Sequence, residues 1–205
     1  MSEILDVVIV GGGLVGGLTA LLLAKGGVQA TVLDAAPVLD PEQVKNILNP
    51  RVLALSQATI HLLKTVDVWN DLPRQMPYTG MHVWNKNGYG EIEFGQASAA
   101  VPTPDQALGS MVEPSLLNLV IQQKMLQQIQ DYRTQVKVVR VEQQVQGWTV
   151  ELADGQVLKT KLVIGADGAN SFVRDQAYIE LDVLDYRQAA ICLLYTSPSP
   201  RDVRS

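Results

Sequence analysis

The sequence is poor in the residues that build cross-linked or metal-bound proteins. Among its 205 residues there are one cysteine, Cys192, and two histidines, His61 and His82. A single cysteine excludes an internal disulfide framework and a zinc site made of several cysteines. Two histidines this far apart in the sequence do not suggest a metal centre, so the chemistry has to be sought elsewhere.

Long hydrophobic runs and an excess of positive charge are also missing. No apolar run reaches the roughly 18 residues that a membrane-spanning helix needs. The first apolar stretch is accompanied by Glu3 and Asp6 rather than by basic residues, so we expect no signal peptide and a cytoplasmic location. The net charge of -5 argues against a nucleic-acid-binding surface. With 47% hydrophobic and 18% charged residues, the chain can nevertheless bury a core.

Glycine is abundant in one place, the stretch GGGLVGG at residues 11–17. An apolar run leads into it and a helical pattern leads out, and this order of strand, glycine turn and helix is typical of dinucleotide binding. Gly11 can turn the chain with a positive φ, Gly13 leaves room for a pyrophosphate, and Gly16 lets the helix lie close to the strand. The helix N-terminus would offer free N–H groups to the phosphates.

A second predicted strand, residues 30–33, ends in Asp34. This acid comes about 20 residues after the glycine turn, where a carboxylate would bind a ribose hydroxyl. The alternative is a plain strand-to-helix turn with glycines that bind nothing. The paired signals favour a nucleotide site.

The next stretch is predicted as a polar loop followed by a helix. Pro37 and Pro41 interrupt regular structure, so residues 38–49 are expected to form a loop. Leucine and isoleucine then recur with roughly helical spacing over residues 50–66. Arg51 would lie at the start of that helix, where a cation is slightly unfavourable against the helix dipole. Its presence there hints at a nearby anion.

The segment from residue 73 has a different character. Residues 81–85 and 91–94 are expected to form two strands joined by a hairpin at Lys86-Asn87-Gly88. Three aromatic side chains lie there: Trp84, Tyr89 and Phe94. They either pack across the strands or form part of a wall for an apolar ligand. Residues 97–107 are predicted to be a loop that returns to the first domain.

A third helix is expected from Pro114 to about Tyr132, followed by strands at residues 136–141, 148–152 and 157–164. A typical nicotinamide-binding domain would continue with another strand–helix–strand unit. A strand meander inside the fold instead indicates the flavoprotein variety.

The last predicted strand ends in Asp167-Gly168, and Asn170 or Ser171 would cap a short helix that contains Arg174. A carboxylate at the carboxyl end of a strand lies where open α/β sheets bind ligands. The alternative is an Asp-Gly turn that merely leads into a capped helix. Next to the glycine turn, we favour the functional interpretation.

Together these stretches resemble the FAD-dependent aromatic hydroxylases, single-component flavin monooxygenases, and most of all their ubiquinone-biosynthesis branch. The resemblance extends to about Tyr186 and rests on these stretches: DVVIVGGGLVGG, RVLAL, GMHVWNKNGYGEIEF, Val112-Glu113 and LVIGADGANSFVR. It implies an α/β fold, a Rossmann-like FAD-binding domain with a β-meander, plus the beginning of a β-rich substrate domain. The expected FAD-binding parts are 1–72 and 103–178, and the expected substrate-domain parts are 73–102 and 179–190. Residues 191–205, rich in Ser, Pro and Arg, are expected to be a non-native tail.

The resemblance also implies a set of cofactor-binding residues: Gly11, Gly13, Gly16, Asp34, Arg51, Glu113, Asp167, Gly168 and Arg174. The three glycines would hold the FAD pyrophosphate and Asp34 the adenosine ribose, with a shorter reach than the glutamate usual at that position. Arg51 would lie over the pyrophosphate or ribityl chain, and Glu113 near the ribityl path. The Asp167-Gly168 motif would serve both FAD and the nicotinamide cofactor, with Arg174 a candidate for the latter.

The implied chemistry uses NAD(P)H as reductant and O2 to hydroxylate a polyprenylated phenol, with no catalytic side chain required. Such a lipid-like substrate leads us to expect contact with the surface of the inner membrane or with a biosynthetic complex. Relatives in this family are longer, so we expect a chain truncated at its C-terminus. Four alternatives stay open: a hydroxylase of a small soluble phenol, a nicotinamide dehydrogenase, an inactive FAD-binding fragment, and a homodimer formed by strand exchange.

Overall fold

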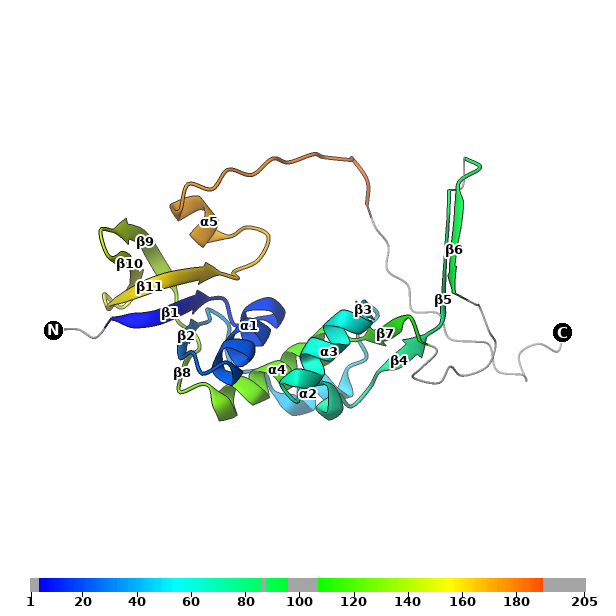
Figure 1. Cartoon of the computed structure of the whole chain (residues 1–205), viewed down its shortest axis with the longest axis horizontal. Helices are drawn as coiled ribbons and strands as arrows, with labels where there is room; N and C mark the ends of the chain where they lie inside the picture. Colours follow the sequence, from blue (N-terminus) through cyan, green and yellow to red (C-terminus); the bar gives the residue numbers. More distant parts are fainter. Residues whose placement is uncertain (1–3, 86–87, 96–106, 190–205) are drawn as a thin grey trace.

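The computed structural model describes residues 4–85, 88–95 and 107–189 (Figure 1). Its largest unit is a six-stranded sheet with the order β8-β2-β1-β11-β10-β9. The strands are β1 (Leu5–Val10), β2 (Ala30–Leu33), β8 (Asp131–Arg133), β9 (Val138–Gln144), β10 (Gly147–Leu152) and β11 (Val157–Gly165). Strands β8, β2, β1 and β11 run parallel to one another, whereas β9, β10 and β11 form an antiparallel meander. The predicted Rossmann-like sheet with a meander is confirmed.

Strand β1 is central because both of its faces are apolar. Val7 and Ile9 point into a core shared with the helices, while Val8 and Val10 point into a second core under the meander. All four are buried, which is typical of a parallel strand covered on both sides. The carboxyl end of β1 is thus fixed between two packed layers.

Most of the helices lie on one face of the sheet and continue away from it, whereas the last helix, which contains Val173, packs on the opposite face with the meander (Figure 1). They are α1 (Leu14–Lys25), α2 (Pro41–Asn46), α3 (Gln57–Thr65), α4 (Pro114–Gln128), α5 (Phe172–Gln176) and a 3-10 turn, η1 (Trp69–Asp71). Helix α1 packs closely on α4, since a Cβ at Gly17 would collide with Ile121. No helix among the described residues is long and apolar enough to cross a bilayer.

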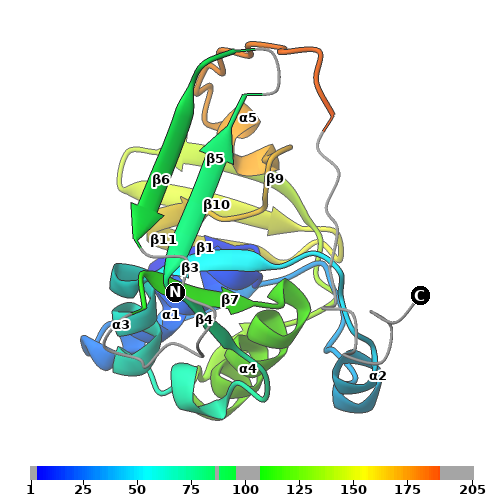
Figure 2. The same ribbon diagram turned by 90° about the vertical axis from the view of Figure 1, so that its right-hand side faces the viewer.

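Two small antiparallel sheets lie beyond the helices. One has the order β3-β7-β4, with β3 (Leu53–Ser56), β7 (Gly109–Val112) and β4 (Met76–Tyr78). The other is the predicted hairpin, β5 (Gly80–Trp84) paired with β6 (Glu91–Gly95), which projects from the body of the molecule (Figures 1 and 2). Lys86 and Asn87 of its predicted turn, and residues 96–106 of the predicted return loop, lie outside the described residues.

The predicted helix from residue 50 is wrong at its start. Leu53 and Leu55 alternate as in a strand, and β3 pairs with β7. The helix α3 begins only at Gln57, after Ser56, whose Oγ accepts a hydrogen bond from the Thr59 N–H (3.3 Å). Arg51 therefore precedes a strand and not a helix.

Two further predicted boundaries need correction. The predicted loop at 38–49 contains the short helix α2, which Pro41 starts and the Asp40 side chain caps by accepting from the Glu42 N–H (2.9 Å). The predicted helix 114–132 ends at Gln128, because the next residues form β8 at the edge of the large sheet. Residues 179–189 are exposed and form no helix or strand (Figure 1), and the predicted tail 191–205 lies outside the described residues.

Candidate functional site

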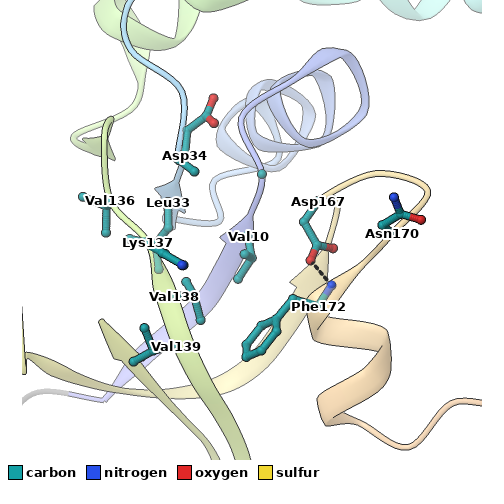
Figure 3. Close-up of a pocket in the computed structure, with 12 residues that line it drawn as sticks. Val10, Leu33, Asp34, Val136, Lys137, Val138, Val139, Asp167, Asn170 and Phe172 are labelled. Carbon is teal, nitrogen blue, oxygen red and sulfur yellow. Dashed lines mark hydrogen bonds between the residues drawn. The ribbon is translucent and has the colours of Figure 1, made fainter. Parts of the chain in front are cut away.

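A cavity of about 580 Å³ opens at the carboxyl ends of the parallel strands (Figure 3). Here β2 pairs on one side of β1 and β11 on the other, so the strand order reverses at β1. Open α/β sheets bind ligands at such a point. The lining residues are Val10, Gly11, Leu33, Asp34, Ala35, Val136, Lys137, Val138, Val139, Asp167, Asn170 and Phe172.

The glycine turn forms one edge of this cavity. Its glycines differ in whether the surrounding backbone leaves room for a side chain. Gly11 has a φ of +102°, and a Cβ there would collide with the Ala166 carbonyl. A Cβ at Gly16 would collide with the carbonyl of Gly11. Gly13, in contrast, has an ordinary φ of -71°, and a Cβ there would meet nothing within 4 Å. Its lack of a side chain therefore leaves open space at the N-terminus of α1.

Asp34 lies at the rim, one residue after β2 (Figure 3). Its N–H donates to the Arg133 carbonyl (2.8 Å), and its Oδ1 accepts from the Ala36 N–H (3.0 Å). A Cβ at Gly12 would come within 2.6 Å of Asp34 Oδ2. The carboxylate is thus held beside the glycine turn, as a ribose-binding acid would need to be.

Asp167 follows β11 and lines the cavity from the other side (Figure 3). Its Oδ1 accepts from the Ser171 Oγ (2.5 Å), and its Oδ2 accepts from the N–H groups of Phe172 (2.6 Å) and Val173 (3.1 Å). Gly168 has a φ of +92°, which lets the chain turn after the aspartate. Asp167 therefore caps α5 and also borders the cavity, while its role toward a cofactor stays a prediction.

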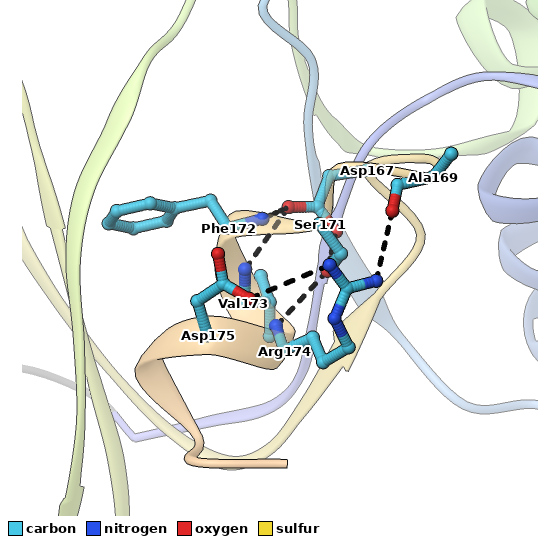
Figure 4. Close-up of polar contacts among 7 residues, drawn as sticks. All are labelled: Asp167, Ala169, Ser171, Phe172, Val173, Arg174 and Asp175. Carbon is cyan, nitrogen blue, oxygen red and sulfur yellow. Dashed lines mark hydrogen bonds and ion pairs between the residues drawn. The ribbon is translucent and has the colours of Figure 1, made fainter. Parts of the chain in front are cut away.

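Arg174 points back at the loop that precedes its own helix (Figure 4). Its Nη1 donates to the Ala169 carbonyl (3.0 Å), and its Nη2 lies 3.5 Å from Asp175 Oδ1. Of the two predicted caps, Asn170 and Ser171, it is Ser171 whose Oγ accepts from the Arg174 N–H (3.1 Å). In this arrangement the guanidinium closes the loop and does not line the cavity.

Arg51 and Glu113 do not line the cavity either. Arg51 is exposed, and its N–H donates to Asn49 Oδ1 (3.0 Å). Glu113 is buried and accepts from the Nε of Arg74 (2.7 Å) and from the Asn49 N–H (2.9 Å). The hydrogen bond from Arg74 holds the pKa of Glu113 below its ordinary value, against the opposing effect of burial. Glu113 thus joins three segments of the chain.

Lys137 is a site residue that sequence reasoning missed. It lies at the meander side of the cavity, at an exposed position just before β9 (Figure 3). It is the only positively charged side chain among the twelve that line the cavity. A basic residue just before a strand carries no sequence signal of its own, because only the fold brings it next to the glycine turn.

The arrangement fits an adenine dinucleotide. The open backbone at Gly13 and the free N–H groups of the α1 N-terminus suit a diphosphate. The Asp34 carboxylate suits a ribose diol, and the walls formed by Leu33, Val136 and Val138 suit a flat apolar ring system. Among the described residues no cluster of His, Cys, Asp and Glu could hold a metal ion.

The comparisons with known proteins agree with this geometry. The family model of the FAD binding domain matches residues 4–204. The 3-demethoxyubiquinol 3-hydroxylase of Escherichia coli (strain K12) is 33% identical over 96% of this chain and 49% of its own length. The ubiquinone hydroxylase UbiL of Rhodospirillum rubrum is 33% identical over 94% of this chain and 44% of its own length. The chain therefore spans about half the length of the curated relatives that it matches.

Solved structures show the same fold. The p-nitrophenol 4-monooxygenase PnpA of Pseudomonas putida DLL-E4 matches with a TM-score of 0.68 at 28% identity, over 90% of this chain and 46% of that one. The flavin-dependent monooxygenase PieE, solved with FAD and substrate, matches with a TM-score of 0.65 at 23% identity, over 88% of this chain and 33% of that one. The chain belongs to the FAD binding domain family of the flavin-dependent monooxygenases.

Proposed function

We propose that this chain is the FAD-binding part of a monooxygenase that uses NAD(P)H and O2 to hydroxylate a polyprenylated phenol in ubiquinone biosynthesis. The observation that carries the cofactor assignment is the glycine turn itself: Gly11 lines the 580 Å³ cavity together with Asp34, Gly12 lies against the Asp34 carboxylate, and the backbone at Gly13 is open. The substrate class is supported by two relatives, each 33% identical, that are named as ubiquinone-pathway hydroxylases.

In this proposal the chain's residues bind and orient the cofactor. The N–H groups at Gly13 and the start of α1 donate to the diphosphate, and Lys137 adds a positive charge. Asp34 accepts from the ribose hydroxyls. FAD, when bound, supplies the electron transfer and oxygen activation that no side chain can. Asp167 keeps the loop after β11 closed against the cavity by accepting from the start of α5.

The remaining assignments are extensions of this proposal. Arg51 and Glu113 would act near the ribityl chain, and Arg174 with Asp167-Gly168 near the nicotinamide cofactor. The segments 73–102 and 179–190 would belong to a substrate domain. A lipid-like phenol would bring the enzyme to the surface of the inner membrane or into a biosynthetic complex, from the cytoplasmic side.

A second candidate function is hydroxylation of a small soluble phenol. The observation in its favour is the 28% identity and TM-score of 0.68 to a p-nitrophenol 4-monooxygenase. The two candidates share the cofactor site and differ only in the substrate.

The cofactor assignment is tested by titrating the chain with FAD while following flavin fluorescence. We expect saturable quenching, together with a thermal midpoint that rises with the FAD concentration. A chain that stays colourless and whose midpoint does not move would contradict the assignment.

Substrate class is tested next, by NAD(P)H oxidation and product analysis with a prenylated phenol and with p-nitrophenol. Faster oxidation and hydroxylation with the prenylated phenol support the first candidate. Hydroxylation of p-nitrophenol alone supports the second.

A further inference from the structure

A second cavity, of about 440 Å³, lies between helix α3, the turn η1 and the small sheet β3-β7-β4. Among the described residues, it shares no lining residue with the cavity at the glycine turn. Gln57, Ile60 and Lys64 of α3 form one wall, because residues three and four apart lie on the same face of a helix. Its volume lies in the range of about 300–1,000 Å³ that is usual for small-molecule sites.

The small sheet contributes Ser110, which lies in its middle strand, β7. Ser110 pairs with Leu55 of β3 and with Pro77 of β4, and directly paired residues point to the same face of a sheet. Leu55 packs against the core that contains Ile60, and Pro77 lines the cavity, so this face is the one toward α3. The Ser110 side chain therefore lies between the sheet and α3, at the floor of the second cavity.

The Ser110 hydroxyl has no hydrogen-bond partner within the described part of the chain. The residue is only 3% exposed, and its Oγ bonds to no described donor or acceptor. A buried polar atom without a partner costs about 1–3 kcal/mol, so such atoms are rare in folded proteins. A ligand that reaches the floor of the cavity would give this hydroxyl the partner that the protein does not.

The second cavity also contains an unpaired positive charge. Lys64 is the only ionisable side chain among the described residues that line it, and it forms no ion pair with a described carboxylate. The charged residues next in the sequence to the lining are already paired. Asp71 lies 2.6 Å from Lys124 Nζ, and Arg74 lies 2.7 Å from Glu113 Oε1. The cavity is therefore suited to an anion.

We propose that the second cavity binds a small aromatic carboxylate, at a site separate from the FAD cavity. One carboxylate oxygen accepts from the Lys64 ammonium and the other from the Ser110 hydroxyl. The ring packs on the apolar wall made by Ile60, Trp69 and Pro77, in which Trp69 is 8% exposed. The site does not depend on whether the chain binds FAD.

The test uses 2-naphthoate and its uncharged analogue 2-naphthamide, titrated into the ¹⁵N-labelled chain and followed by two-dimensional NMR. We expect saturable shifts of the Trp69 indole and Ser110 amide signals, and a Kd for the amide at least about fivefold weaker. Lys64→Gln should weaken 2-naphthoate by at least about fivefold and 2-naphthamide by less than about twofold. The control is Lys159→Gln, at an exposed position of β11 outside this lining, which should change neither Kd.

Ser110→Ala separates binding from folding. Because the hydroxyl bonds to no described residue, this variant should melt no lower than the wild type, while it weakens 2-naphthoate about 3- to 10-fold. A lower thermal midpoint would mean that the hydroxyl serves the fold, and the inference would be overturned. It would also be overturned by wild-type affinity of Lys64→Gln or Ser110→Ala, by shifts at Gly11 and Lys137 instead of Trp69, or by no saturable shift in the wild type. FAD binding is measured in parallel, since its absence would refute the proposed function and leave this site standing.

Discussion

At the scale of single residues, the glycine turn contains one glycine that packing requires and one that packing does not require. A Cβ at Gly16 has a backbone carbonyl in its way, whereas a Cβ at Gly13 would enter open space. The two positions therefore separate an effect on stability from an effect on binding.

We predict that Gly13→Ala folds like the wild type but raises the Kd for FAD at least about tenfold, because the new methyl group occupies the approach to the diphosphate. Gly16→Ala should lose stability, by about 1–3 kcal/mol as in other overpacked sites. Thermal melts and FAD titrations of both variants check this. Wild-type FAD affinity in a folded Gly13→Ala chain would show that the diphosphate does not pass this turn.

Lys137 gives a second prediction at this scale. Lys137→Gln removes the one positive charge in the cavity lining, so it should weaken FAD binding about 3- to 10-fold at low salt and less at high salt. Lys159→Gln, at an exposed position of β11 and outside this lining, is the matched control. If the two variants have the same Kd for FAD at low salt, Lys137 does not take part in binding FAD.

A third prediction concerns the contribution of Glu113 to the stability of the fold. Glu113→Gln weakens the charge-assisted hydrogen bonds from Arg74, and Arg74 is partly exposed, so we expect a loss of about 1–3 kcal/mol in the free energy of unfolding. The exposed pair of Arg140 and Glu142 provides the control, since Glu142→Gln should change stability by less than about 0.5 kcal/mol. Chemical denaturation measures both variants. If Glu113→Gln lowers the free energy of unfolding no more than the control does, the ion pair of Arg74 and Glu113 does not stabilise the fold.

At the scale of elements, the β5–β6 hairpin stands apart from the rest. Its apolar face is made of Met81, Val83, Ile92 and Phe94, and each of these is at least 38% exposed. Two strands without a covering layer are marginally stable. Strands β1 and β11, in contrast, are paired on both edges in the middle of a six-stranded sheet, and β1 is packed on both faces.

We therefore predict that the paired amides of β5 and β6 exchange with deuterium far sooner than those of β1 and β11. Hydrogen-exchange mass spectrometry on the chain, with peptides from each element, measures the difference. Equal protection would indicate that the hairpin is covered by another surface in solution.

The elements also show what sequence patterns can and cannot predict. The glycine turn, the strand before it, Asp34 and the meander were predictable, because each has a local pattern or turn residue. Strand β8 was not, because three residues at a sheet edge carry no periodicity and are defined by pairing with β2. The same holds for β3, whose partner β7 lies more than fifty residues away in the sequence.

Site residues divide in the same way. Gly11 and Asp167 are recognisable from motifs. Lys137 is not, because only the fold of the meander against β1 and β2 brings it into the cavity lining. Glu113 was predicted as a cofactor residue on the strength of a motif, while its hydrogen bonds to Arg74 and Asn49 could only be found in three dimensions.

At the scale of the whole molecule, two carboxylates make the stability of the fold depend on pH. The pKa of Glu113 is lowered mainly by its hydrogen bond with Arg74, and that of Asp131 mainly by its hydrogen bond with Arg133. A carboxylate whose pKa is lower in the folded state stabilises the fold above its unfolded-state value. That contribution is lost as the pH falls through the folded-state pKa.

We predict that the thermal midpoint changes little between pH 7 and about 5 and falls progressively below the ordinary Glu and Asp values of 4.5 and 3.8. Glu113→Gln should flatten this fall, because one of the two titrating groups is removed. Melting curves over this pH range decide the matter. The same acid dependence in Glu113→Gln and wild type would place the responsible groups elsewhere.

The position of β1 between β2 and β11 also has a consequence for biosynthesis. Val7 of β1 pairs with Ala30 of β2 on one side and with Leu162 of β11 on the other. A ribosome that has made the first hundred residues has therefore released only one of these two partners. The side chains of Val8 and Val10 stay exposed until the ribosome has released the meander. During that interval they can bind a chaperone or take part in aggregation.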